Sequence, residues 1–290
     1  MILGEIQISE CVTRLRVSEV SGVGSRRVLD RSSWISADIR NCERLSALLT
    51  AEIKAAREAG AVRVEVAAAR ALRGTRLLRL LDRVARTAGT DGVHIPPAAD
   101  TLAAGFLAVT RPRVTELDGP VAVALIGDEA TGLAVGTPGH PPEWVGSRPL
   151  GAATLTDRAR FTDPPLPNQI EAAVNGAMRA IGSLALPESE RIFLTTPMWA
   201  TLERLCGSTI QAAAARRGLD SILGQTEQDI AAWFGAESGR ARLLPATVVL
   251  TFALAELTGS AVEPCPVDPV AGRFWLAESR HFPPAAMRVV

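Results

Sequence analysis

The chain has 290 residues, 47% of them hydrophobic, which is enough for two domains of ordinary size or one large domain. Its 31 basic and 31 acidic residues cancel, so the composition gives no electrostatic case for nucleic acid or an anionic membrane as a partner. Lys54 is the only lysine, and it lies in a helical pattern where a solvated side chain is expected. A lysine-based phosphate loop or Schiff base is therefore excluded unless Lys54 supplies it.

The cysteine spacing and the lengths of the apolar segments indicate in which cellular compartment the protein is expected. Four cysteines lie far apart and form no paired spacing, so they predict neither a zinc site nor a disulfide framework: Cys11, Cys42, Cys206 and Cys265. The first ten residues lack the basic stretch and apolar run of a signal peptide. No uncharged apolar run reaches the roughly 18 residues of a membrane span. We therefore expect a cytoplasmic protein without a membrane segment.

The first part of the chain predicts a mixed α/β domain. Alternating apolar residues predict three strands in succession, and helices then alternate with two further strands. The expected strands are residues 2–9, 14–20, 26–36, 62–69 and 93–96, and the expected helices are residues 46–58, 75–89 and 98–111. Three antiparallel strands followed by strand, helix, strand and helix are typical of one actin-like (ribonuclease-H-like) domain.

The same order of elements restarts after a boundary expected near residues 112–120. The expected strands are residues 121–129, 132–139, 143–150 and 191–196, and the expected helices are residues 167–182, 198–205 and 246–259. From Ile210 onward the pattern is mostly helical. Two rounds of one pattern predict a duplicated α/β fold. We expect two actin-like domains, residues 1–117 and 118–290, each a mixed sheet flanked by helices, with a cleft between them.

Three segments, in order and with sensible gaps, resemble parts of one family. AAARALRGT (67–75) is similar to a strand-to-helix segment with Ala-Leu-Arg, and SRPLGAATLTD (147–157) is similar to Ser-x-Pro-Leu-Gly-Ala-x-x-Leu-Thr-Glu. RARLLPATVVLTFALAEL (240–257) resembles the start of a late buried helix. The chain therefore resembles the exopolyphosphatase / guanosine pentaphosphate phosphohydrolase (Ppx/GppA) family. The resemblance implies two actin-like domains around a cleft and a family activity, hydrolysis of the terminal phosphoanhydride of polyphosphate or guanosine pentaphosphate, usually with a divalent metal.

All three of the family's phosphate loops are changed here, and the first and third lose a glycine or an amide donor. Backbone that wraps phosphate needs glycines, because they let amide groups approach the anion closely. The first loop, Asp-Ile-Gly-Ser-Asn-Ser in the family, corresponds to QISECV, in which Gln7 replaces the acid, Ser9 replaces the glycine and Glu10 adds a negative charge. The third, Gly-Gly-Thr before a helix, corresponds to Thr-Pro-Met, and Pro197 removes an amide donor.

The second loop, Asp-Ile-Gly-Gly-Gly-Ser-Thr-Glu in the family, corresponds to LIGDEATG. Gly127 and Thr131 remain and are the candidate phosphate-binding residues of this loop. Asp128 and Glu129 replace two glycines, and their carboxylates repel phosphate unless a metal intervenes. They are therefore the candidate ligands for Mg²⁺ or Mn²⁺ if the protein is active, and otherwise no cofactor is expected.

Arg73 and Asp100 are the remaining candidates. Arg73 keeps the Ala-Leu-Arg context and is the candidate for holding an anion, against the alternative of a surface arginine at a helix start. Asp100 corresponds to a position near the family's acidic catalytic base, against the alternative of a helix cap. Thr154 stands where the family has an arginine, which weakens the anion site further.

Three hypotheses remain open from the sequence, and whether the chain is an enzyme is one of the open points. The loop changes favour a degenerate family member that hydrolyses little or nothing and acts by binding a ligand or a protein partner. The alternative is an active phosphohydrolase that uses Arg73, Asp100 and a metal at Asp128 or Glu129. A third hypothesis is a structural subunit that forms a homodimer through its helical C-terminal part. The resemblance implies polyphosphate or guanosine polyphosphate as ligand, and no nucleic acid or membrane is expected.

Overall fold

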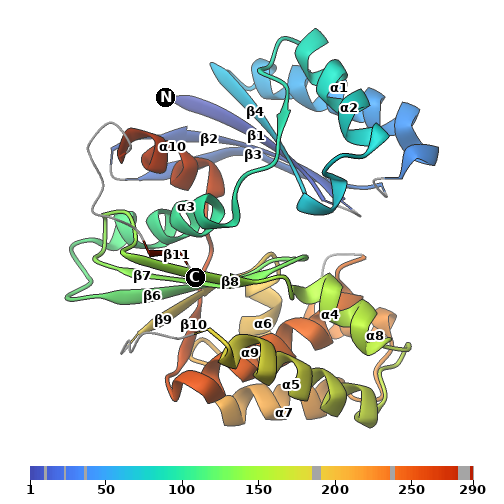
Figure 1. Cartoon of the computed structure of the whole chain (residues 1–290), viewed down its shortest axis with the longest axis vertical. Helices are drawn as coiled ribbons and strands as arrows, with labels where there is room; N and C mark the ends of the chain where they lie inside the picture. Colours follow the sequence, from blue (N-terminus) through green and yellow to red (C-terminus); the bar gives the residue numbers. More distant parts are fainter. Residues whose placement is uncertain are drawn as a thin grey trace. The chain divides into compact units, whose positions relative to one another are not determined.

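The chain divides into two compact units, each with one mixed sheet flanked by helices (Figure 1). A computed structural model describes residues 1–9, 12–22, 24–35, 38–184, 191–235, 239–279 and 288–289. One unit comprises Met1–Ala104 with Asp268–Glu278, and the other comprises Gly105–Val267 with Ser279–Val290. The sequence pattern predicts the division at residue 118, with the whole C-terminal part in the second domain. The structure divides within helix α3 (Ala98–Thr110) instead and returns one C-terminal helix to the first unit.

The first unit has a five-stranded sheet in the order β3-β2-β1-β4-β5. Its strands are β1 (Ile2–Ile8), β2 (Val12–Val20), β3 (Ser25–Trp34), β4 (Arg63–Ala68) and β5 (Val93–His94). β1, β2 and β3 pair antiparallel, whereas β1, β4 and β5 pair parallel. Its helical elements, apart from the start of α3, are η1 (Ile39–Asn41), α1 (Cys42–Glu58), η2 (Arg70–Leu72), α2 (Arg76–Thr87) and α10 (Pro269–Ser279).

The second unit repeats this topology. Its sheet runs β10-β9-β6-β7-β8-β11, formed by β6 (Val121–Ile126), β7 (Thr131–Gly136), β8 (Trp144–Arg148), β9 (Ile192–Thr195), β10 (Val262–Pro264) and β11 (Arg288–Val289). β6, β7 and β8 pair antiparallel, and β6, β9 and β10 pair parallel, as their counterparts do in the first unit. The predicted duplication is therefore confirmed, with β11 as an added parallel strand beside β8.

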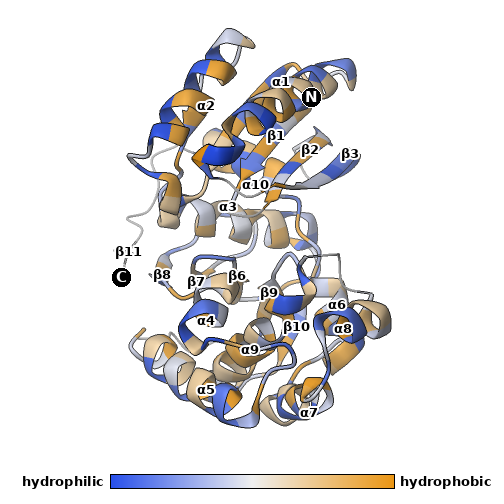
Figure 2. Ribbon diagram, turned by 90° about the vertical axis from the view of Figure 1, so that its right-hand side faces the viewer, coloured by the Kyte–Doolittle hydropathy of each residue, from blue (hydrophilic) through white to orange (hydrophobic). Residues whose placement is uncertain are grey.

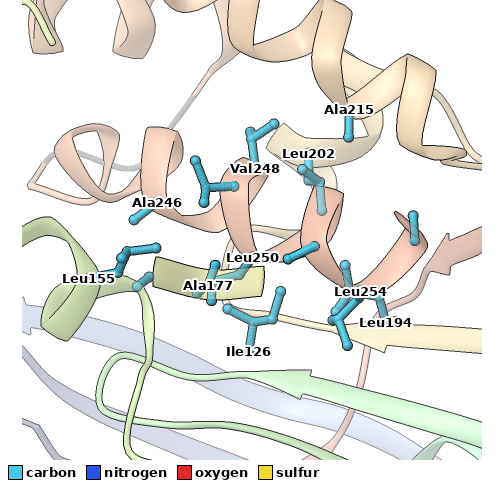
Figure 3. Close-up of a cluster of buried hydrophobic side chains, with 14 of the residues drawn as sticks. Ile126, Leu155, Ala177, Leu194, Leu202, Ala215, Ala246, Val248, Leu250 and Leu254 are labelled. Carbon is cyan, nitrogen blue, oxygen red and sulfur yellow. The ribbon is translucent and has the colours of Figure 1, made fainter. Parts of the chain in front are cut away.

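Helix α9 (Leu244–Thr258) is the centre of the second unit's core. It is apolar around its whole circumference, and it packs against α4 (Ala152–Ala159), α5 (Pro167–Gly182) and α7 (Ala212–Ile222). Figure 3 shows Leu250 and Leu254 of this helix among side chains from the sheet and the neighbouring helices. The stretch from Ala241 to Thr258 is long and apolar enough to cross a membrane, but most of it is buried inside this unit. Such burial is the pattern of a core helix.

The sheet of the first unit has a helix pair on one face and α10 on the other. Ile6 faces α1 and α2, whose leucines bury the same side of the sheet. Glu5 points to the opposite face because side chains alternate along a strand. There Arg273 of α10 places Nη2 at 3.0 Å from Glu5 Oε1, and Trp275 donates from Nε1 to the Ser21 carbonyl at 2.8 Å. These contacts explain why α10 belongs to the first unit.

The structure contains elements that the sequence pattern did not indicate. α4 follows β8 directly and has only two buried side chains, Ala152 and Leu155, so its apolar periodicity is weak. β10 is three residues long and ends in Pro264, a residue that normally weakens a strand prediction. The other helical elements are η3 (Arg111–Arg113), α8 (Glu227–Phe234) and η4 (Ala241–Leu243), together with α6 (Trp199–Cys206), which corresponds to the helix expected over residues 198–205.

Candidate functional site

The turn between β6 and β7 carries four of the residues predicted for the site. The Gly127 amide donates a hydrogen bond to the Ala130 carbonyl at 2.9 Å, which closes the turn. Asp128 and Glu129 lie between these two residues, and Thr131 begins β7. β6 is a nearly continuous buried apolar strand, and the residues of this turn are the first polar side chains after it.

The carbonyl groups of this turn lie against the first turn of α4. The Ala152 amide donates to the Gly127 carbonyl at 2.8 Å. The amides of Ala153 and Thr154 both donate to the Asp128 carbonyl, at 2.9 and 3.2 Å. The first amides of a helix have no partner within the helix and commonly bind anions. In this chain carbonyls of the β6–β7 turn bind three of them.

Gly151 makes this approach of turn and helix possible. A Cβ atom at this position would lie 2.4 Å from the Gly127 carbonyl oxygen and 2.5 Å from the Ala130 nitrogen. Both distances are far shorter than non-bonded contacts allow. The glycine of the SRPLGAATLTD segment therefore has a structural role, which is to let the turn dock on the helix.

The carboxylate of Asp128 is paired with a buried arginine. Arg240 Nη1 lies 3.3 Å from Asp128 Oδ1, and the arginine side chain is only 6% exposed. Arg240 comes immediately before η4 and α9, in the segment that resembles the start of the family's late buried helix. The negative charge that was expected to repel phosphate is thus balanced within the protein. No local sequence pattern connects these two residues.

Thr131, predicted to bind phosphate, is buried at the start of β7. Its Oγ1 donates to the Leu150 carbonyl at 2.7 Å, and the residue is 1% exposed. The hydroxyl therefore joins β7 to the segment that leads into α4. Together with the contacts of Gly127 and Asp128, this bond fixes the turn against residues 150–154.

The turn after β1, the counterpart of the family's first phosphate loop, also uses its polar groups within the chain. The amide and the hydroxyl of Ser9 donate to the Val12 carbonyl at 2.9 and 3.0 Å. The Val12 amide donates back to Ser9 Oγ at 3.1 Å. Gln7, which replaces the acid, is exposed, and Glu10 lies outside the described residues. The serine in place of glycine therefore closes the β1–β2 hairpin.

The third loop lies between β9 and α6. Thr196 is buried, its carbonyl accepts from the Trp199 amide at 3.1 Å, and its Oγ1 accepts from the Met198 amide at 3.4 Å. Pro197 is exposed and has no amide hydrogen to donate. Two amides at this helix start are therefore bound by Thr196, and a third is missing.

The two remaining candidates lie in the first unit. Arg73 follows η2 and is exposed, and within the described ranges no acidic side chain pairs with it. Asp100 is half-buried in the first turn of α3, which begins at Ala98. It therefore lies inside the helix and not at its cap. In this first turn its carboxylate interacts favourably with the helix dipole. In the second unit, one turn brings together the other four candidates, Gly127, Asp128, Glu129 and Thr131.

The metal predicted at Asp128 and Glu129 finds few ligands in the described structure. Among the residues that are placed, no group of three or more His, Cys, Asp or Glu could hold a metal ion. Mg²⁺ and related ions need oxygen ligands on about six sides. The guanidinium of Arg240 beside Asp128 also opposes a second cation there. These residues do not fit a bound metal well, and the site stays a prediction.

A pocket of about 340 Å³ in the second unit lies apart from the predicted residues. It is formed by the end of α4, the loop after it, the start of α8 and the start of α9. Its charged lining residues are Asp157, Arg160, Asp163, Glu227 and Arg242. Asp163 Oδ1 accepts from the Glu227 amide at 2.7 Å, so one of these carboxylates caps α8. None of the residues predicted for the site lines this pocket.

Comparison with solved structures identifies the fold. No known family model matches the sequence, and no curated protein sequence is similar to it. An Aquifex aeolicus member of the Ppx/GppA family superposes with a TM-score of 0.80 at 18% identity, over 98% of this chain and 99% of the other. An exopolyphosphatase-like protein gives 0.81 at 16% identity, over 97% and 99% of the two chains. An exopolyphosphatase from Cytophaga hutchinsonii gives 0.77 at 15% identity, over 96% and 97%.

These similarities extend over nearly the whole of each chain. They agree with the repeated sheet order and with the three sequence segments that resemble the family. The identities are low, so the similarity concerns the fold and leaves the chemistry of the loops open. The chain has the two-unit, actin-like fold of the Ppx/GppA proteins.

Proposed function

We propose that this chain is a divergent Ppx/GppA protein that binds polyphosphate or a guanosine polyphosphate and hydrolyses it slowly or not at all. The fold supports the lineage. One observation carries the proposed loss of hydrolysis: the turn that corresponds to the second phosphate loop is bound to α4 by its carbonyls and to Arg240 by Asp128. Polar groups that contact one another are not free to contact a phosphate.

Catalysis of phosphate release needs donors that neutralise several oxyanions and hold a water in line with the phosphorus. Ser9 and Thr131 instead hydrogen-bond to backbone carbonyls nearby. Pro197 contributes no amide at the third loop. The three loops thus offer fewer donors than the glycine-rich loops that the resemblance implies. This loss supports a binding role over rapid turnover.

The alternative is an active phosphohydrolase, and one observation favours it. Arg73 is exposed and has no acidic partner among the described residues, so its guanidinium is available to an anion. Asp100 in the first turn of α3 is the candidate base. In this alternative Arg73 neutralises a terminal phosphate and Asp100 accepts a proton from the attacking water.

The decisive experiment measures phosphate release from long-chain polyphosphate and from guanosine pentaphosphate, with magnesium or manganese present. The wild type is compared with Arg73→Ala and Asp100→Ala, and calorimetry in the same buffers measures binding. We expect binding of one ligand with release no faster than the buffer blank. Release that both substitutions abolish would establish the active alternative. Absence of binding by a folded wild type would overturn the proposal.

We further propose that the protein acts in the cytoplasm. Its most apolar helix is accounted for as the core of the second unit. Fractionation of cells that express the full chain tests this. Light scattering of the purified chain tests the homodimer, and a mass of twice 30.6 kDa would support it.

A further inference from the structure

Four arginines form one exposed row along α2. Arg76, Arg79, Arg83 and Arg86 are all exposed, and three or four residues separate each from the next. With 3.6 residues per turn, their side chains fall within an arc of about 80°. At 1.5 Å per residue, the row is about 15 Å long. We call these four residues the arginine row.

The opposite side of α2 holds the helix in place. Leu77, Leu81 and Ala85 are buried in the core of the first unit, directly opposite the arginine row. Figure 2 shows the resulting bands of hydrophilic and hydrophobic residues along α2. Because the apolar side is packed on its own sheet, the row is presented on a rigid support.

The row has an excess of positive charge. Asp82 is the only acid in α2, and its carboxylate pairs with Arg86 at 3.0 Å and accepts from the Val93 amide. Arg79 Nη1 donates to the Gly74 carbonyl at 3.2 Å. For Arg76 and Arg83, no partner occurs among the placed residues. The chain as a whole has a net charge of zero, so this local excess is not a consequence of general basicity.

We propose that the arginine row is a docking surface for inorganic polyphosphate, an extended polyanion with a negative charge on every unit. Planar guanidinium groups bind phosphate oxygens through two parallel hydrogen bonds. A linear chain of phosphates can contact all four arginines along one line. The row shares no residue with the three loops, and it would hold the polymer without contributing to its cleavage.

The composition of α2 distinguishes this ligand from other polyanions. Surfaces for single-stranded nucleic acid combine basic residues with aromatic side chains on which bases stack. The sequence RLLRLLDRVART contains no aromatic residue. Helices that bind membranes insert their apolar face into the lipid. Here that face is buried in the protein, so recognition by charge alone is the remaining mode.

Binding of the full chain to long-chain polyphosphate and to tripolyphosphate tests the inference, in 50 and 200 mM salt. The test variant is R76Q/R79Q/R83Q/R86Q, because glutamine keeps a helix propensity close to that of arginine. The control variant is R158Q/R179Q/R204Q/R217Q, which removes the same charge from exposed arginines on helices of the second unit. Circular dichroism confirms that both variants are folded.

We expect the test variant to bind long-chain polyphosphate on the order of 10-fold more weakly in 50 mM salt. The slope of log K against log salt should become shallower by about 3, since each lost phosphate contact removes about 0.7. Tripolyphosphate is too short to contact the whole row, so its affinity should fall less in the test variant. The control should stay within about twofold of the wild type, apart from the general effect of net charge.

The inference rests on polyphosphate as the ligand of the proposed function, and the two fail separately. A wild type that binds polyphosphate while the test variant binds equally well overturns the docking surface alone. A wild type that binds no polyphosphate overturns the docking surface, and it overturns the proposed function as well if guanosine pentaphosphate does not bind either. Single-stranded DNA that binds more tightly than polyphosphate, and loses its affinity in the test variant, would assign the row to nucleic acid instead. If the fourfold variant does not fold, R79Q/R83Q should still weaken binding about threefold.

Discussion

Arg240 Nη1 and Asp128 Oδ1 lie 3.3 Å apart, although 112 positions separate the two residues in the sequence. The pair connects the turn after β6 to the segment that begins η4 and α9. Each of the two segments resembles the family by itself, and nothing in the sequence indicates that they are in contact. Their contact shows that the carboxylate of the turn and the buried arginine before α9 form one ion pair.

Removing the Asp128 carboxylate should destabilise the second unit. Asp128→Asn leaves the guanidinium of a nearly buried arginine with a weaker partner, and we expect a loss of about 1–3 kcal/mol in the free energy of unfolding. Urea denaturation at neutral pH measures this loss of stability. Asp118→Asn, at an exposed position of the same unit, should change stability by less than about 0.5 kcal/mol. An equal effect of both substitutions would mean that the pair does not stabilise the fold.

Gly151→Ala should be among the most damaging single-methyl substitutions in the chain. The added Cβ would meet the Gly127 carbonyl oxygen at 2.4 Å, and neither backbone segment can move without breaking the hydrogen bonds to α4. We expect a loss of about 3 kcal/mol or more, measured by urea denaturation.

The matched control is Gly176→Ala in α5, where no atom lies within 4 Å of the added Cβ. Alanine favours a helix over glycine, so this variant should gain about 0.5–1 kcal/mol. If Gly151→Ala were tolerated as well as Gly176→Ala, the docking of turn and helix would be looser than the distances indicate.

The fold was predictable because strands and helices carry their own periodicity. β1 and β6 each begin a run of three strands, and the mostly apolar, buried character of these two strands is visible in the sequence. The repeat of this order predicted the duplication that the two sheets confirm. α4 was missed because its eight residues bury only Ala152 and Leu155. β10 was missed because three residues that end in Pro264 form a strand only through pairing with β9.

The site was predictable only in part. Family resemblance located the turn at Gly127, but it could not show that Thr131 bonds to Leu150 or that Arg240 balances Asp128. Those contacts join segments between 19 and 112 positions apart, and no local pattern encodes them. The positions of the loop residues were therefore accessible from sequence, whereas their present roles depend on tertiary contacts.

Glu5 and Arg273 should hold α10 on the sheet of the first unit. Their side chains are 4% and 17% exposed, with 3.0 Å between Oε1 and Nη2. Arg273→Met takes away the cation at 3.0 Å from the buried Glu5 carboxylate and leaves it Arg16, which stands opposite Glu5 in the β1–β2 register, and we expect a loss of about 3 kcal/mol in urea denaturation. Faster hydrogen exchange of the α10 amides should accompany it.

Two comparisons separate this effect from a general loss of charge. Glu5→Leu combined with Arg273→Met removes both charges of the pair and should recover most of the stability, because Arg16, the other buried cation near Glu5, keeps Asp30 as a partner. Arg26→Met breaks an exposed Arg–Glu pair of the same sheet and should cost no more than about 1 kcal/mol. A double variant as unstable as Arg273→Met would show that packing of the arginine, and not its charge, holds the helix.

Cys206 and Cys265 should make the protein sensitive to alkaline pH. Burial raises the pKa of each thiol to about 11, from an ordinary value of 9.0. The unfolded chain therefore loses these protons at lower pH than the folded chain, so the thiols' contribution to stability is constant below about pH 9 and falls between about 9 and 11. The chain has no tyrosine and a single lysine, so few other side chains titrate in this range; the exception is Arg16, because burial lowers its pKa to about 10. Urea midpoints at pH 7, 9, 10 and 11 measure the decline, and C206A/C265A should show a smaller one from its own value at pH 7. Parallel declines in wild type and variant would mean that other groups cause the alkaline loss.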